Sequence, residues 1–303
     1  MSEGPAGQPI EKEGLVGTLF HPDAPGPRPT VIVLGRSGGG LKEGGAAALA
    51  SEGFTALALA YFGIDPLPPE LVEIPLEYFS EAIAWLKDQP AVDPDRIALV
   101  GNSKGAELAL LLGAMYPEDI RAVVGYAPSG VVWQSPSFDF RSIRQPRSSW
   151  SLGSDPVPFV RFAPPRFKDM IGMIGLLVGR PMAFRPFYER SLDDEDAVAT
   201  ASIAVERIEG PVLLISGTDD QVWPSTPLSE MVIERLEEHD HPFRHEHLRY
   251  EGAGHLMVPG LQTGMNMESL GRVKLGGSSE ANEFASADSW PKVLDFLEDY
   301  LEK

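Results

Sequence analysis

Apolar residues along the chain fall into short unbroken runs and into longer stretches with helical spacing. The run TVIVLG at 30–35 is almost wholly apolar and does not alternate, as expected for a strand that is covered on both faces within a parallel sheet. Turn-forming glycine and proline residues bound such runs. We therefore predict strands at residues 14–23, 28–35, 54–63, 95–101, 120–128, 210–217 and 243–252.

Stretches with helical spacing separate these strands. Between residues 70 and 88 apolar side chains recur at broadly helical intervals, which predicts a helix. Strands that alternate with helices indicate an α/β fold with a doubly wound, mostly parallel sheet and right-handed crossovers. The further helices are expected near 42–52, 103–116, 225–238 and 289–301.

Residues 131–200 interrupt this alternation. They are rich in proline, serine, arginine and aromatic residues, so we predict an irregular cap insertion over one end of the sheet. A chain of 303 residues is long enough for one large α/β domain. We therefore predict a single domain, 1–303, that carries the cap at about 131–200.

Composition and charge exclude several classes of function. The formal net charge of −19 argues against nucleic acid as a partner, because phosphate binding needs a basic face. No apolar stretch reaches the roughly 18–20 residues that span a membrane, and the start MSEGPAGQPIEKEG lacks the regions of a signal peptide. Cysteine is absent, which excludes disulfides and thiolate chemistry. We expect a cytoplasmic protein that acts on a small molecule without a cofactor.

The candidate chemistry starts at Ser103, in the sequence GNSKG. This motif lies where a predicted buried strand passes into a predicted helix. A nucleophile elbow occupies such a place, because the serine takes a strained backbone and the flanking glycines remove side chains that would collide. The alternative interpretation is a tight strand-to-helix turn without chemistry, and the surrounding pattern favours the elbow.

A serine nucleophile needs a base and an acid in the chain order Ser, acid, His. His255 lies in the loop YEGAGHLM after the last predicted strand, and Asp219 and Asp220 follow the preceding strand in GTDDQVW. We favour Asp220 as the acid, since it stands third after a glycine. The histidines of 239–247 could form a metal cluster by composition, but they straddle a helix end and a strand, so we interpret them as a solvated surface and predict no metal site.

The fourth element is the loop LGRSGGGL after the first central strand. An oxyanion hole needs two backbone N–H groups close to the nucleophile. We assign one to Lys104, at the start of the helix, and the other to Ser37 or Arg36 in this loop. The competing interpretation, a phosphate cradle, lacks both the GxGxxG spacing and a following GK[ST].

Six segments together resemble a known family. LGRSGGGL, ASEGFTALALAYFG, LPPELVEIPLEYFSEAIAWL, GNSKGAELAL, GTDDQVW and GAGHL occur in an order and spacing similar to the C-terminal domain of acyl-CoA thioesterases and bile acid-CoA:amino acid N-acyltransferases. The similarity covers most of residues 13–302 and weakens in 131–200. It implies an α/β-hydrolase fold of the dienelactone-hydrolase-like kind, acyl-thioester chemistry and the catalytic triad Ser103, Asp220, His255.

The chain departs from this family in two respects. Family members carry an N-terminal β-sandwich domain, which we expect this chain to lack because only about a dozen residues precede its first predicted strand. The known acyltransferases use cysteine at the position of Ser103, which argues against amide synthesis. We therefore expect a serine hydrolase that cleaves an acyl thioester or a carboxylic ester. The alternatives are a carboxylesterase that acts on a non-CoA ester and an acyl-CoA:amino acid N-acyltransferase.

Charge in the cap bears on the substrate. Residues 131–190 hold nine basic and four acidic residues in an otherwise acidic chain. If the cap covers Ser103, its arginines could bind the phosphates of CoA through charge-assisted hydrogen bonds; the alternative is that they pair with the acidic body of the protein. The candidates for phosphate binding are Arg141, Arg144 and Arg147.

Overall fold

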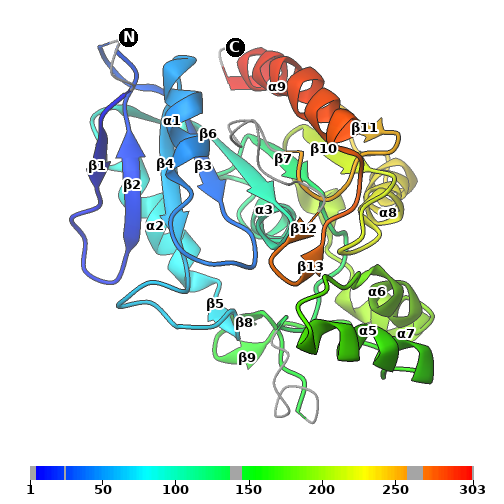
Figure 1. Cartoon of the computed structure of the whole chain (residues 1–303). Coiled ribbons are helices and arrows are strands. Elements are labelled where there is room, and N and C mark those ends of the chain that lie inside the picture. The colour runs from blue at the N-terminus through cyan, green and yellow to red at the C-terminus, as the bar shows by residue number, and fades with distance from the viewer. Residues whose placement is uncertain (1–4, 24, 137–144, 258–268, 302–303) are drawn as a thin grey trace.

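The computed structural model describes residues 5–23, 25–136, 145–257 and 269–301. Its centre is an eight-stranded sheet in the order β1-β2-β4-β3-β6-β7-β10-β11 (Figure 1). All neighbours from β4 to β11 pair in parallel, whereas β1 and β2 pair antiparallel at one edge. The strands are β1 (Gly7–Pro9), β2 (Val16–Phe20), β3 (Arg28–Leu34), β4 (Thr55–Ala60), β6 (Val92–Asn102), β7 (Ala122–Tyr126), β10 (Val212–Gly217) and β11 (His245–Tyr250).

Helices cover both faces of this sheet, which explains why its central strands β4, β7 and β10 are buried at every position and almost wholly apolar. Along β6, for example, Leu99 belongs to the buried cluster on one face and Ala98 to the cluster on the other. One face is covered by α2 (Glu77–Lys87), α3 (Lys104–Met115) and α8 (Ser225–Glu238); the other is covered by α1 (Glu43–Ser51) and α9 (Ser279–Leu301). The predicted doubly wound, mostly parallel α/β fold is therefore confirmed.

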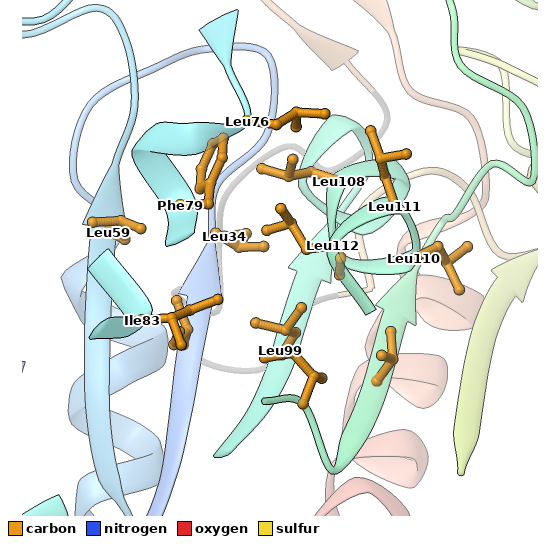
Figure 2. Close-up of a cluster of buried hydrophobic side chains, with 14 of the residues drawn as sticks. Leu34, Leu59, Leu76, Phe79, Ile83, Leu99, Leu108, Leu110, Leu111 and Leu112 are labelled. Carbon is orange, nitrogen blue, oxygen red and sulfur yellow. The ribbon is translucent and has the colours of Figure 1, made fainter. Parts of the chain in front are cut away.

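Helix α3 is the central helix of the first face. It is buried from Lys104 to Ala114, and its leucines meet the side chains of α2 and of the sheet, including Phe79 and Leu34 (Figure 2). Apart from Lys104 and Glu107 its residues are apolar on every side, as expected for a helix inside a core. This burial fixes the start of α3, which is where the candidate nucleophile lies.

The cap follows β7. It contains β8 (Trp150–Leu152), β9 (Asp155–Pro156), α5 (Phe167–Leu177), α6 (Arg185–Ser191) and α7 (Glu195–Ala201). The short 3₁₀ helix η1 (Val205–Arg207) lies between the cap and β10. Figure 1 shows α5, α6 and α7 grouped at one end of the molecule, on the same side as β8 and β9. Trp133, Tyr188 and Trp223 pack there in a separate apolar cluster.

The structure differs from the sequence prediction at two element boundaries. The predicted helix 70–88 is helical only from Glu77, because Ile74–Pro75 forms the short strand β5 that pairs with β8. Proline disfavours a helical conformation in the residue before it, so the apolar spacing of 71–76 reflects burial and not a helix. Helix α9 begins at Ser279, ten residues before the predicted start.

Besides β5, η1 and the elements within the cap, one further strand and one hairpin were not predicted. β1 pairs only with β2 at the sheet edge, and the hairpin β12 (Ser269–Leu270) and β13 (Val273–Lys274) precedes α9. These strands have two or three residues each, too few for an alternating pattern. Among the helices in the described ranges, none is long and apolar enough to cross a membrane.

Candidate active site

Ser103 occupies the turn between β6 and α3 with φ 55° and ψ −120°. A serine in this region of the backbone map is strained by about 1–3 kcal/mol, and such strain persists only where the surroundings impose it. Here the strand and the helix approach so closely that a Cβ on Gly101 would lie 2.1 Å from the Gly105 carbonyl oxygen. The two glycines of the motif are therefore required by contact between backbones.

Hydrogen bonds join Ser103, His255 and Asp220 in a line. Ser103 Oγ lies 2.8 Å from His255 Nε2, and His255 Nδ1 lies 2.8 Å from Asp220 Oδ2. All three residues are at most 4% exposed. A carboxylate only accepts hydrogen bonds, so Nδ1 carries the imidazole proton and Nε2 is free to accept the serine proton. This arrangement has the geometry that base-assisted nucleophilic attack requires.

The two aspartates of the acid loop have different partners. Asp220 is fully buried, and its Oδ1 accepts the backbone N–H groups of Val222 and Trp223 at 2.9 and 3.2 Å. Asp219 instead accepts from the Gln221 amide at 2.6 Å and from the Gly277 N–H at 2.9 Å. The structure thus brings Asp220, and not Asp219, to the imidazole of His255.

A segment around residues 275–282, which was not predicted as part of the site, forms hydrogen bonds to the loops that carry Asp220 and His255. The carbonyl of Leu275 accepts the N–H groups of both His255, at 3.0 Å, and Gln221, at 3.1 Å. Fully buried Asn282, from α9, accepts the N–H of Gly254 at 2.6 Å. In the sequence, only the paired glycines at 276 and 277 could have indicated a close backbone contact in this segment. A single asparagine within a helix, such as Asn282, does not indicate a role in the site.

The glycine-rich loop after β3 lies directly against the elbow. A Cβ on Gly105 would lie 2.3 Å from the Leu34 carbonyl oxygen and 2.5 Å from that of Gly35. Within the described part of the chain, the N–H groups of Arg36, Ser37 and Lys104 have no hydrogen-bond acceptor. Unpaired backbone donors beside a nucleophile are what an oxyanion hole supplies.

The cap arginines divide into two groups. Arg141 and Arg144 lie outside the described residues. Arg147 donates through its Nε to Glu73 Oε1 at 3.0 Å and forms a second bond to the same carboxylate. This contact holds the pKa of Glu73 below its usual value. Arg147 is therefore paired with the acidic body of the protein. This is the second of the two alternatives given above for the cap arginines, the first being phosphate binding.

Arg36 has a different environment. Its side chain is half-buried, and burial lowers its pKa. No ion pair joins it to any residue within the described ranges. An unpaired, partly desolvated cation on the loop beside Ser103 is a candidate receptor for an anion. The same described ranges contain no group of His, Cys, Asp and Glu residues that could hold a metal ion.

The family follows from comparison with known proteins. Residues 74–303 match the model of the family "BAAT / Acyl-CoA thioester hydrolase C terminal". The chain belongs to this family. Mouse mitochondrial acyl-coenzyme A thioesterase 2 is 30% identical over 293 residues, which are 95% of this chain and 59% of that protein. Rat acyl-coenzyme A amino acid N-acyltransferase 2 is 30% identical over 300 residues, which are 96% of this chain and 65% of that protein. The chain thus spans less than two thirds of the length of these relatives.

Solved structures agree with the fold. A dienelactone hydrolase-like promiscuous phosphotriesterase from metagenomic libraries has a TM-score of 0.54 at 17% identity and covers 98% of this chain and 99% of its own. Acylaminoacyl peptidase from Pyrococcus horikoshii has a TM-score of 0.59 at 13% identity, over 99% of this chain and 42% of its own. The resemblance to the family and the α/β-hydrolase fold are both confirmed.

Proposed function

We propose that this protein is a serine hydrolase that cleaves an acyl thioester such as an acyl-CoA. The observation that carries the proposal is the hydrogen-bonded line from Ser103 through His255 to Asp220, built on an elbow that two backbone contacts enforce. Membership of the acyl-CoA thioester hydrolase family supports the choice of thioester.

In the first half of the reaction Ser103 Oγ attacks the thioester carbonyl while His255 Nε2 takes the hydroxyl proton. Asp220 stabilises the imidazolium that forms, since its carboxylate holds Nδ1 and is itself held by two N–H groups. The carbonyl oxygen becomes an oxyanion, which the N–H groups of Lys104 and of Arg36 or Ser37 stabilise. His255 then returns its proton to the leaving sulfur, and an acyl-serine ester remains.

In the second half water replaces the thiol. His255 takes a proton from water, the hydroxide attacks the acyl-serine ester, and the same oxyanion hole stabilises the second tetrahedral intermediate. The imidazolium then protonates Ser103 Oγ as the acid leaves. Each proton that His255 accepts is returned within the same half-reaction, so the enzyme ends in its starting state.

The charge of CoA suggests how the leaving group binds. We assign Arg36, which has no ion pair within the described ranges, to an anionic group of the substrate, with Arg141 and Arg144 as further phosphate ligands. Arg147 is left out of this set because it is paired with Glu73. Replacing Arg36 with Gln, or Arg141 and Arg144 together, should raise KM for an acyl-CoA but not for a neutral aryl ester. Raised salt should have the same effect, because exposed charges are screened over roughly 8–10 Å at 0.1–0.15 M. Equal changes in KM for the acyl-CoA and the aryl ester would mean that these arginines hold the structure in place and do not bind phosphate.

A second candidate function is transfer of the acyl group to an amine, as the name of the rat N-acyltransferase relative describes. Ser103 argues for water instead. An acyl-serine is an oxyester, which is much less prone to aminolysis than the thioester that a cysteine would form. Incubation with an acyl-CoA and excess glycine or taurine should therefore yield mainly free acid, and Ser103→Cys should shift products toward amide. Mostly amide from the unchanged protein, by mass spectrometry, would assign it to the transferases.

A side-by-side panel of acyl-CoA and aryl esters tests the thioester proposal. We expect higher kcat/KM for the acyl-CoA substrates and competition by free CoA. A preference for aryl esters without competition by CoA would point to a carboxylesterase. The names of relatives include mitochondrial and peroxisomal proteins, so a cytoplasmic location stays a prediction to be tested by fractionation.

A further inference from the structure

A buried ion pair lies immediately behind the candidate nucleophile. Lys104 Nζ is 2.6 Å from Glu107 Oε1, and the two side chains are 3% and 0% exposed. Burial lowers the pKa of Lys104 and raises that of Glu107. Desolvating two charges is costly, and apolar residues of similar volume often stabilise a fold as well or better. The stability of the fold alone therefore gives no reason for a charged pair at this position.

The pair joins the elbow helix to the cap. Glu107 Oε1 accepts the indole N–H of Trp150 at 2.8 Å, and Lys104 Nζ donates to the carbonyl of Trp133 at 3.5 Å. The same ammonium lies 5.4 Å from the centre of the Trp150 ring. Both tryptophans belong to the cap and are fully buried. The first turn of α3 is thus attached to the cap by its two charged side chains.

The same tryptophan reaches the glycine-rich loop. The ring of Tyr61 lies 5.7 Å from that of Trp150, and the buried Tyr61 hydroxyl donates to the carbonyl of Gly35. Gly35 directly precedes Arg36 and Ser37, which carry the second oxyanion donor in the proposed mechanism. One continuous set of buried contacts therefore joins both halves of the proposed oxyanion hole, the Lys104 N–H and the loop at 36–37.

We propose that Lys104, Glu107, Trp150 and Tyr61 form a positioning network that fixes the two oxyanion donors relative to Ser103 through the cap. The inference rests on the proposed serine mechanism. None of these side chains touches the reacting atoms; each acts by holding the backbone N–H groups in place. Because stabilisation by such donors depends on their preorganised geometry, loosening the network should slow the chemical steps and leave substrate binding nearly unchanged.

The decisive variant removes both charges together. Lys104→Met or Glu107→Gln alone leaves one uncompensated buried charge and should lower Tm by about 5–8 °C. Lys104→Met/Glu107→Gln removes both charges and keeps an amide oxygen for the Trp150 N–H, so Tm should return to within about 3 °C of the wild type. We expect kcat of this double variant to stay at least tenfold low while KM changes less than threefold. A purely structural pair would recover kcat together with Tm.

A matched control is available in the cap. Arg190 and Asp169 form another pair, 2.7 Å apart and 10% and 7% exposed. The variant Arg190→Met/Asp169→Asn should leave kcat within twofold of the wild type. The wild type is also tested for labelling of Ser103 by a fluorophosphonate. If Ser103 is not labelled, the serine mechanism is refuted. If Ser103 is labelled but the Lys104→Met/Glu107→Gln variant is fully active, only the positioning network is refuted.

A second variant decides the question if the double variant does not fold. Tyr61→Phe removes only the hydroxyl that holds Gly35, and we expect about a tenfold loss of kcat with KM unchanged. The comparison is Tyr78→Phe, which removes a hydroxyl that donates to the Ala60 carbonyl at 2.5 Å and should leave kcat within twofold. If Tyr61→Phe is as active as Tyr78→Phe, the positioning network is refuted.

Discussion

Gly105→Ala tests the contact between the elbow helix and the glycine-rich loop. The added Cβ would lie 2.3 and 2.5 Å from two backbone carbonyl oxygens, where an ordinary contact is 3.4–4 Å. Backbone on both sides must therefore separate by roughly 1 Å. Alanine gains about 1 kcal/mol over glycine in a helix, but overpacking of this kind costs typically 1–3 kcal/mol and occasionally more. Because both collisions involve backbone, we expect a net loss of about 2 kcal/mol.

The shift should affect catalysis more than stability. Moving the loop by about 1 Å displaces one proposed oxyanion donor relative to Ser103, and a misplacement of that size can cost about 10²-fold in rate. We expect thermal unfolding to show a Tm about 3–4 °C lower and steady-state kinetics to show a kcat at least tenfold lower. A variant with the Tm and kcat of the wild type would refute the close approach of helix and loop.

Gly44→Ala provides the matched control. Gly44 lies in the exposed first turn of α1, where a Cβ would meet nothing within 4 Å. The same substitution there should raise stability by about 0.5–1 kcal/mol through helix propensity alone and leave kcat unchanged. Opposite signs of the change in Tm at the two glycines would show that the contact, and not the alanine, causes the loss.

Two further predictions concern carboxylates. Asp220→Asn should lower kcat by at least about 10³-fold and Asp219→Asn by less than tenfold, since only Asp220 bonds to His255. The reverse order in an activity assay would show that the acid is misassigned. The second prediction concerns the pair of Arg235 and Glu206. Arg235 holds the pKa of Glu206 below its usual value. Their pair therefore stabilises the fold above the unfolded carboxyl pKa, and this contribution is lost as pH falls through the lower folded value. Glu206→Gln should cost less than about 1 kcal/mol at pH 7, and its difference in stability from the wild type should shrink as the pH falls and the Glu206 carboxylate becomes protonated; a difference that does not shrink in acid would exclude this linkage.

The fold was predictable because burial gives its central strands and helices apolar patterns that can be read in the sequence. The central strands are covered on both faces and so are largely apolar, and α3 is apolar except for Lys104 and Glu107 because it is buried on every side. Where burial and secondary structure diverge, the prediction was wrong. Leu71, Ile74 and Leu76 are buried, Ile74 pairs with Trp150 in a short strand, and Pro75 disfavours the helix that their spacing suggested.

The candidate site was predictable only where the local backbone constrains the residue type. The glycines beside Ser103 mark a close backbone approach, and the loop order locates Asp220 and His255. The residues that support the site have no such local sequence pattern. Asn282 and Leu275 act through contacts between segments that are distant in the chain, and Glu107 is one acidic residue in an acidic protein until the structure buries it against Trp150.

In the proposed mechanism Ser103 carries the acyl group during turnover. The most direct test is to mix the protein with an acyl-CoA, quench in acid within the first turnovers, and map the acylated peptide by mass spectrometry. We expect an acyl ester on Ser103 that disappears in Ser103→Ala together with at least 99.9% of the activity, in line with the ~10³-fold or greater losses that follow removal of a triad member. An acyl group on another residue, or more than a tenth of the activity left in Ser103→Ala, would contradict it.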